Sequence, residues 1–301
     1  MSRTSAEIET QPDCWRRAAR LAAEAATVAA LPADGVEVAV VGCGTSLFMA
    51  QSYAALRESA GRGRTDAFPA SEYPHERAYP YVLALCRSGT TSEVVALLER
   101  LPAASDSLVL AGVAGTPATA AARHALVLDF ADEESVVQTR FATTALTFLR
   151  ATLGADVTRA AADAERALTA PLPLEPAHTE QVSFLGTGWT YGLANEAALK
   201  LREAAQFWAE SYFAMEYRHG PVSIAAPGRA VWPFGPLPPG LAEQIVATGA
   251  TLVRTGDLDP LAALVLAQRF AVAAAAARGL DPDQPRALTR SVILPVTEVT
   301  P

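Results

Sequence analysis

A short apolar run that leads into a small-residue turn and then into a helix-forming segment occurs three times in this chain. The runs cover residues 36–41, 81–86 and 182–185, and the turns contain Gly42-Cys43-Gly44, Ser88-Gly89-Thr90 and Gly186-Thr187-Gly188. Apolar runs that alternate with helices are typical of parallel strands buried on both faces. The sequence therefore predicts an α/β fold with parallel sheets flanked by helices.

The rest of the chain fits the same scheme. Further strands are expected over 107–113, 125–130 and 251–254, and helices over 14–31, 47–58, 92–100, 132–153, 241–248 and 261–277. The proline-rich stretch 170–176 separates two halves, and 227–240, with five prolines, is expected to be a loop. The second half resembles a degenerate copy of the first. We therefore predict an N-terminal helical segment (1–33), two domains (34–170 and 178–290) and a C-terminal tail (291–301).

One helix, expected over 193–207, carries Lys200, which is the only lysine among 24 Lys and Arg residues. Glu196, Lys200 and Glu203 are spaced so that they share one helix face. Unlike a guanidinium, an amine can transfer a proton near neutral pH once it is buried. The alternative interpretation is a surface Glu–Lys pair worth about 0.3 kcal/mol. The glycine turn before the helix and the His219 turn after it favour a functional role.

Both turns of the first half have the composition of an anion site. Small residues let backbone N–H groups face an anion, and hydroxyls add donors at a helix N-terminus. The residues concerned are Gly44, Thr45 and Ser46 in the first turn and Ser88, Gly89, Thr90 and Thr91 in the second. Arg87 could add a charge-assisted contact to the same anion. The alternative is that the hydroxyls only cap two helices.

A dinucleotide-binding fingerprint is incomplete in both halves. Gly42-Cys43-Gly44 and Gly186-Thr187-Gly188 match its first two glycines, but Leu47 and Tyr191 occupy the third position. The third glycine of that fingerprint permits close packing of helix on strand. NAD is therefore not expected, and no cofactor is predicted.

Charge and composition bound the function further. A net charge of −8 argues against nucleic acid or an anionic membrane as the main partner. The N-terminus lacks the apolar core of a signal peptide, and 261–280 is interrupted by Gln268, Arg269 and Arg278, so a buried helix is a better interpretation than a membrane span. The three cysteines and four histidines show no metal-ligand spacing, so no metal is predicted. Widely spaced cysteines, odd in number, suit a reducing compartment, and we expect a cytoplasmic protein.

Five segments together resemble the sugar isomerase (SIS) family. They are 42–46, 87–91, 196–203, Arg218-His219-Gly220-Pro221 and Asp283-Gln284-Pro285-Arg286. The chain is most similar to the isomerase half of glucosamine-6-phosphate synthase and to SIS-type amino-sugar-phosphate deaminases, over nearly its whole length and in the same order. The resemblance implies two tandem flavodoxin-like SIS domains in a homodimer whose sites lie between subunits.

The resemblance also implies roles for individual residues. Thr45, Ser46, Ser88 and Thr91 would hold the phosphate of a sugar phosphate. Glu203 would move a proton between carbons 1 and 2 of the sugar. His219, donated by the partner chain, and Lys200 would assist ring opening, and Glu196 would orient its neighbours.

Three departures from the synthase pattern narrow the activity. No N-terminal nucleophilic cysteine or glutaminase segment is present in this sequence, so no glutaminase activity is expected. Arg87 stands where the synthase has a Gln, which is more like the deaminase branch. Arg290 stands where the synthase tail has a Lys, and we keep it as a candidate substrate-binding residue although an arginine cannot form an imine.

Proton abstraction next to a carbonyl gives an enediol or enolate, and the fate of that intermediate defines the reaction. Reprotonation at carbon 1 gives aldose–ketose isomerisation, and a free 2-amine can then be lost as ammonia. Expulsion of the 3-hydroxyl gives dehydration when the amine is acetylated. We therefore predict a glucosamine 6-phosphate deaminase/isomerase first and an N-acetylglucosamine-6-phosphate dehydratase second. A non-catalytic sugar-phosphate sensor is the third possibility.

Overall fold

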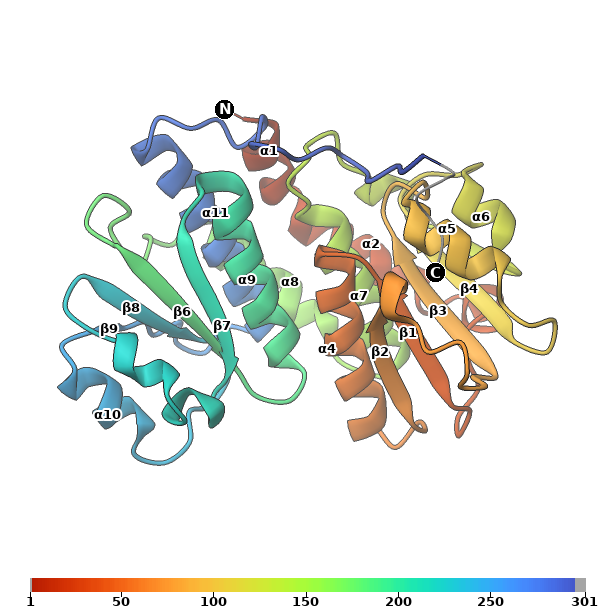
Figure 1. Ribbon diagram of the computed structural model, residues 1–301, viewed down its shortest axis with the longest axis horizontal. Helices are drawn as coiled ribbons and strands as arrows, with labels where there is room; N and C mark the ends of the chain where they lie inside the picture. Colours follow the sequence, from red (N-terminus) through yellow and green to blue (C-terminus); the bar gives the residue numbers. More distant parts are fainter. Residues whose placement is uncertain (1, 296–301) are drawn as a thin grey trace. The chain divides into compact units, whose positions relative to one another are not determined.

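The computed structural model describes residues 2–295 and divides into two compact units. Unit A contains residues 13–157 and the tail from Thr289, and unit B contains residues 2–12 and 158–288. Both contain one parallel sheet between helices, as Figure 1 shows for each unit.

Unit A is built on a five-stranded parallel sheet with the order β2-β1-β3-β4-β5. Its strands are β1 (Val38–Gly42), β2 (Thr65–Pro69), β3 (Tyr81–Cys86), β4 (Asp106–Ala111) and β5 (His124–Val127). Its helices are α2 (Gln11–Leu21), α3 (Ala25–Val28), α4 (Thr45–Ser59), η1 (Ala70–Glu72), α5 (Ser92–Glu99), α6 (Pro117–Ala121), η2 (Asp129–Ala131) and α7 (Arg140–Thr152). This is the flavodoxin-like strand order, whose direction of progression reverses between β1 and β3.

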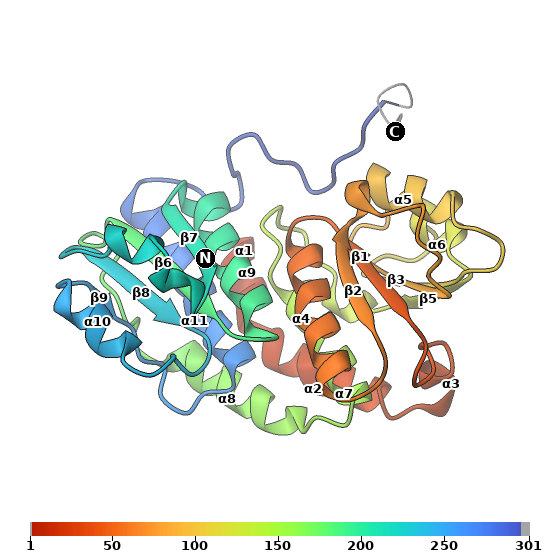
Figure 2. The same cartoon turned by 60° about the horizontal axis from the view of Figure 1, so that its bottom comes forward.

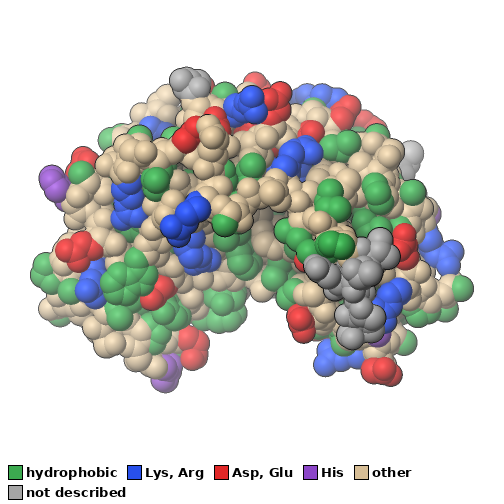
Figure 3. Space-filling model, turned by 45° about the horizontal axis from the view of Figure 1, so that its top comes forward, with side chains coloured by type: hydrophobic (Ala, Val, Ile, Leu, Met, Phe, Trp, Pro, Cys, Tyr) green, Lys and Arg blue, Asp and Glu red, His purple; other side chains and the backbone are tan. Residues whose placement is uncertain are grey.

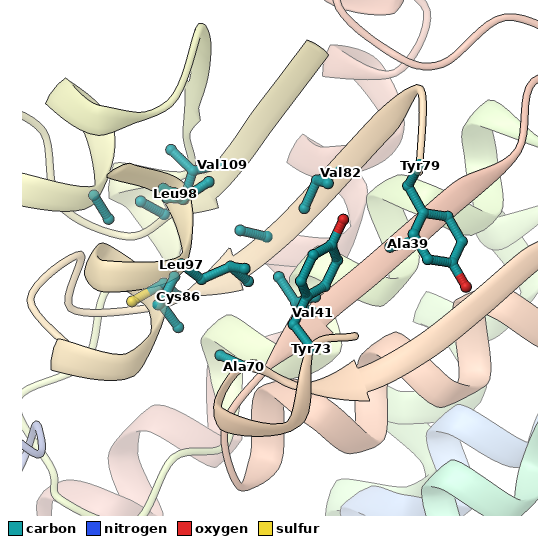
Figure 4. Packing of buried hydrophobic residues seen from close by; sticks show 14 residues of the cluster. Ala39, Val41, Ala70, Tyr73, Tyr79, Val82, Cys86, Leu97, Leu98 and Val109 are labelled. Atoms are coloured by element: carbon teal, nitrogen blue, oxygen red, sulfur yellow. The ribbon is translucent and has the colours of Figure 1, made fainter. Parts of the chain in front are cut away.

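The helices of unit A cover both faces of its sheet, with α5 and α6 on one side and α4 and α7 on the other (Figure 2). Alternate residues of a strand face opposite sides. Ala39 and Val41 therefore belong to the same core cluster as Leu97 and Leu98 of α5 (Figure 4), while Val40, between them in sequence, is buried on the other face. Burial on both faces explains why these strands are apolar without alternation.

Unit B repeats this arrangement with four parallel strands in the order β7-β6-β8-β9. Its strands are β6 (Gln181–Gly186), β7 (Trp208–Phe213), β8 (Arg229–Pro233) and β9 (Thr251–Leu252). Its helices are α1 (Arg3–Glu9), α8 (Val157–Thr169), α9 (Thr190–Ala205), η3 (Glu216–Arg218), η4 (Pro221–Ile224), α10 (Leu241–Ala247) and α11 (Pro260–Ala277). The order matches β2-β1-β3-β4 of unit A, which confirms that the second half is a degenerate copy of the first.

The two units also share the turn after their central strand. In unit A a Cβ on Gly42 would lie 2.7 Å from the backbone carbon of Ser46, and in unit B a Cβ on Gly186 would lie 2.4 Å from Tyr191 Cα. Gly44 and Gly188 follow with φ of 54° and 55°, in the left-handed region that favours glycine. Each turn thus brings the start of a helix close to the carboxyl end of a strand.

Helix α11 is long and apolar enough to cross a membrane by length and composition. However, 67% of the 18-residue helix is buried within the protein, and α11 packs along α9 in unit B. Phe270 of α11 contacts both Trp232 and Phe207 at centroid distances of 6.2 and 6.0 Å. A core position therefore accounts for its apolar composition, as expected for a buried helix.

Three expected elements differ from the structure. The helix expected over 14–31 ends at Leu21, because Ala23 and Glu24 make i to i−3 turn bonds to the carbonyls of Arg20 and Leu21 in place of helical bonds. The helix expected over 132–153 begins only at Arg140. In the loop expected over 227–240, Ala230, Val231 and Trp232 are buried in β8 between β6 and β9. The strands β2 and β7, at the sheet edges, were not predicted.

The division into units also differs from the predicted domains. Helix α8, which belongs to the predicted first domain, is joined to unit B by hydrogen bonds from Arg269 Nη1 to the carbonyls of Ala167 and Ala170. In addition, Asp163 Oδ2 accepts a bond from the Asp259 backbone N–H. The chain from Thr289 returns to unit A. These contacts join segments that are far apart in sequence, which explains why the proline-rich stretch gave a different boundary.

Candidate active site

Helix α9 of unit B brings the three charged residues of its face together. Lys200 Nζ lies 2.5 Å from Glu203 Oε2 and 3.4 Å from Glu196 Oε1. The side chains of Lys200 and Glu196 are only 1% exposed. The interpretation of a surface ion pair is therefore wrong, because this is a buried cluster of two carboxylates and one ammonium.

Glu203 differs from the other two members of this cluster. Its side chain is 19% exposed, and it lines a pocket of about 440 Å³. The other residues that line the pocket are Leu199, Arg202, Gln206, Phe207, Arg286 and Leu288, all in unit B. Pockets that bind small molecules have volumes of roughly 300–1,000 Å³. Glu203 is therefore the carboxylate of the cluster that a small molecule can reach.

Two arginines give this pocket a positive environment around Glu203. Arg202 Nη1 donates a hydrogen bond to the Ala209 carbonyl at 2.8 Å, which fixes the guanidinium near the end of α9. Burial lowers the pKa of Arg202, and the carboxylates of Glu203 and Glu196 offset part of this shift. Arg286 ends the tail motif Asp283-Gln284-Pro285-Arg286, but neither its place in this pocket nor that of Arg202 was predicted.

His219 does not join this cluster within one chain. It is exposed and follows η3, which comes after β7 and therefore lies at the carboxyl end of the strands of unit B. Glu203 lies near the end of α9, directly before β7 begins, and therefore at the amino end of the same strands. Figure 1 shows α9 and β7 as consecutive elements of this unit. Two residues at opposite ends of one sheet cannot act on the same atom.

In unit A the two small-residue turns lie at the carboxyl ends of β1 and β3, on either side of the point where the strand order reverses. Thr45 and Ser46 are buried and open helix α4 directly after Gly44. Thr91 precedes the first residue of α5 as its N-cap. In doubly wound sheets ligands bind at this reversal point. The sequence motif and the topology thus indicate the same location for an anion.

Hydroxyl groups of the second turn lie close to one another and to the C-terminal tail. Thr90 Oγ1 and the Thr90 backbone N–H both lie within 3.2 Å of Ser88 Oγ. Ser88, Thr90 and Thr91 each have their hydroxyl oxygen within 3.4 Å of Ser291 Oγ. Gly89 stands between them with φ of 66°. Ser291 was not predicted as a site residue, because no local pattern links it to a turn 200 residues away.

Arg87 was expected to face the anion, but its guanidinium holds the backbone of neighbouring segments. Nη1 donates to the Ser135 carbonyl at 2.9 Å, and Nη2 donates to the Arg290 carbonyl at 2.7 Å. The carboxylate oxygen Glu133 Oε2 lies 3.8 Å from Arg87 Nη1, and both side chains are buried. Arg87 therefore orders the tail and the loop before α7.

Arg290 is likewise engaged within unit A. Its Nε donates to the Glu133 carbonyl at 3.0 Å, and its Nη2 lies 2.5 Å from Asp132 Oδ1. Glu133 Oε1 in turn accepts bonds from the backbone N–H groups of Thr139 and Arg140 at 2.6 Å. This buried carboxylate caps α7, which explains why residues 132–139 are not helical.

Cys43 lies in the first turn without adding charge to it. Burial raises the pKa of its thiol to about 12, and Glu93 contributes in the same direction. The thiol is therefore protonated near neutral pH and does not repel an anion.

Within residues 2–295, no group of three or more His, Cys, Asp or Glu side chains is arranged to hold a metal ion. On the face shown in Figure 3, basic and acidic side chains are interspersed among the described residues.

No protein-family model matches the chain. It is 27% identical to the isomerizing glutamine–fructose-6-phosphate aminotransferase of Methanothermobacter thermautotrophicus over 85% of this chain and 51% of that protein. The chain thus spans about half the length of this curated relative.

Two solved structures have the same fold. The glucosamine-6-phosphate deaminase of Thermotoga maritima matches with a TM-score of 0.83 and 23% identity, over 97% of this chain and all of that one. The C-terminal domain of glucosamine-fructose-6-phosphate aminotransferase from Francisella tularensis matches with a TM-score of 0.81 and 19% identity, over 95% and 98%. These likenesses confirm the predicted resemblance and the α/β fold class.

Proposed function

We propose, from the SIS fold of this chain and its similarity to amino-sugar-phosphate proteins, that it is an enzyme acting on an amino-sugar 6-phosphate. The observation that carries the proposal is the position of Glu203. It is the member of a buried carboxylate–ammonium cluster that reaches a pocket. A positioned carboxylate of this kind suits proton abstraction beside a carbonyl.

In the proposed reaction Glu203 removes the proton on carbon 2 of the open-chain sugar, and the electron pair moves onto the aldehyde oxygen. When the amine is free, return of the proton to carbon 1 gives an imine at carbon 2, the position of the ketose carbonyl. Water then adds to this imine and releases ammonia. Lys200, 2.5 Å from the carboxylate, holds Glu203 in place and compensates its charge before the proton is taken.

The phosphate is assigned to the two turns of unit A. Hydroxyls of Thr45, Ser46, Ser88 and Thr91 and the start of α4 and α5 offer donors of the kind that phosphate binds. Arg87 and Arg290 stabilise the segments next to these turns, because Arg87 binds the Arg290 carbonyl of the tail and Arg290 binds Asp132. No metal or cofactor is required by this proposal.

We also propose that the chain acts as a homodimer in the cytoplasm, with His219 supplied by a second copy. The support is that His219 lies at the other end of the sheet from Glu203 in its own chain. Large apolar side chains stand near the His219 turn, where Phe213 and Met215 are 45% and 49% exposed. Such a patch suits contact with a partner.

The reaction itself is tested by incubating the purified protein with glucosamine 6-phosphate and, separately, with its N-acetyl form. We expect ammonia and a hexose 6-phosphate from the first substrate, measured by an ammonia assay and mass spectrometry. A product lighter by one water from the N-acetyl form would favour the dehydratase alternative. Binding of either sugar without any turnover would contradict an enzyme and favour a sensor.

The shared site is tested by complementation. Glu203→Gln and His219→Ala chains, each inactive alone, are mixed and allowed to exchange subunits. Half of the dimers are then mixed and contain one intact site of two, so about a quarter of wild-type activity is expected. Each variant treated in the same way by itself is the control. Activity no greater than that of the separate variants would show that His219 does not act across a dimer.

A further inference from the structure

Residues 289–295, which we call the C-terminal strap, occupy the hydroxyl donors of the second turn in unit A. Ser291 Oγ accepts hydrogen bonds from Thr90 Oγ1 at 2.9 Å and from Ser88 Oγ at 3.1 Å. Thr91 Oγ1 is 3.4 Å from the same atom. An oxygen that accepts from two or three hydroxyls at one turn is in the position that an oxygen of a bound anion would take.

The strap also uses the N-terminus of α5. The backbone N–H of Ser92, the first residue of that helix, donates to the Val292 carbonyl at 3.1 Å. In the opposite direction, the Leu294 N–H donates to Ser92 Oγ at 2.9 Å. A first-turn N–H of a helix is a group that would otherwise bind an anion. The strap therefore satisfies both kinds of donor, hydroxyl and backbone, with its own oxygens.

Buried and charged contacts hold the strap there, one residue before Ser291. Arg87 Nη2 donates to the Arg290 carbonyl, and the Arg290 guanidinium pairs with Asp132. These contacts lie beside the turn and involve no hydroxyl of Ser88, Thr90 or Thr91. The strap can thus be anchored at Arg290 while the segment from Ser291 onward leaves the turn.

We propose that the strap is an internal occupant of the phosphate site, which substrate phosphate displaces on binding. This inference rests on the proposed function, since it assumes that the phosphate binds at Ser88–Thr91. The exchange is favourable because hydrogen bonds to a charged acceptor are roughly twice as strong as those between neutral groups. Phosphate binding and release of the strap are consequently coupled, and the strap lowers the apparent affinity for phosphate.

The test compares wild type with Ser291→Ala by calorimetric titration with inorganic phosphate and with glucosamine 6-phosphate. Removing the internal acceptor is expected to lower Kd about 3- to 10-fold for both. Ser71→Ala, which removes an exposed hydroxyl from η1, is the matched control and is expected to leave Kd unchanged. Ser88→Ala is expected to raise Kd, which identifies the turn as the phosphate site.

A second measurement does not depend on substitution. The Leu294 backbone N–H donates to Ser92 Oγ while the strap is bound, so saturating phosphate is expected to accelerate hydrogen exchange at this N–H in the wild-type protein, measured by mass spectrometry. A higher or unchanged Kd in Ser291→Ala, or slower exchange of the Leu294 N–H when phosphate is added, would overturn the strap proposal alone when Ser88→Ala still weakens binding. If Ser88→Ala binds phosphate as tightly as wild type, or if neither wild type nor any variant binds phosphate, the assignment of the phosphate site is wrong. The strap proposal then fails with it.

Discussion

The Glu203→Gln variant is expected to lose about 10²- to 10⁴-fold in kcat, because a glutamine of nearly the same shape cannot accept the proton of carbon 2. The loss should fall on kcat much more than on KM, since the substitution leaves the hydroxyl donors proposed for the phosphate unchanged. Steady-state ammonia release from glucosamine 6-phosphate measures both constants.

Two controls make this result specific. Glu243→Gln removes one negative charge at an exposed position of α10 and is expected to leave kcat unchanged. Unfolding by urea shows whether Glu203→Gln is folded. A folded Glu203→Gln protein with wild-type turnover would mean that another group takes the proton.

Replacing Lys200 by Met is expected to cost about 3–5 kcal/mol of unfolding free energy, in addition to any loss of activity. The variant keeps most of the side-chain volume but removes the ammonium from between two carboxylates, one of which, Glu196, is fully buried. A buried carboxylate that loses its neighbouring cation is far from water and is therefore destabilising. Urea denaturation at pH 7 measures the change.

The double variant Lys200→Met/Glu196→Gln separates charge from packing. It removes the buried carboxylate charge together with the ammonium and is expected to recover a large part of the stability lost in the single variant. A cost below about 1 kcal/mol in Lys200→Met, of the size measured for exposed pairs, would show that the cluster is open to water in solution.

Local periodicity was sufficient to predict the elements that hold the catalytic candidates. Strand β3 was predicted with the bounds Tyr81–Cys86, and the spacing of Glu196, Lys200 and Glu203 gave their common face on α9. Both features depend on residues within eight positions of one another. Burial of Lys200 depends instead on which segments pack against α9 in the folded chain, and the spacing of residues along one helix does not reveal this.

The direction of Arg87 could not be predicted in this way. Its guanidinium is held by the Arg290 carbonyl, 203 residues later, and by Ser135, 48 residues later. The composition of the turn suggested a contact with an anion, whereas long-range hydrogen bonds assign the side chain to the strap. Strand β8 was missed for a related reason, because prolines on both sides of a buried strand look like a loop until its partners β6 and β9 are known.

A single buried ε-amine makes this chain its own reporter of local opening. An amine-directed acylating reagent has only one side-chain target, and Lys200 is 1% exposed in the folded state. The rate of its modification therefore measures how often α9 opens to solvent, without an introduced label. Slower acylation of Lys200 Nζ in the presence of a sugar phosphate would show by how much binding in the pocket reduces the opening of α9.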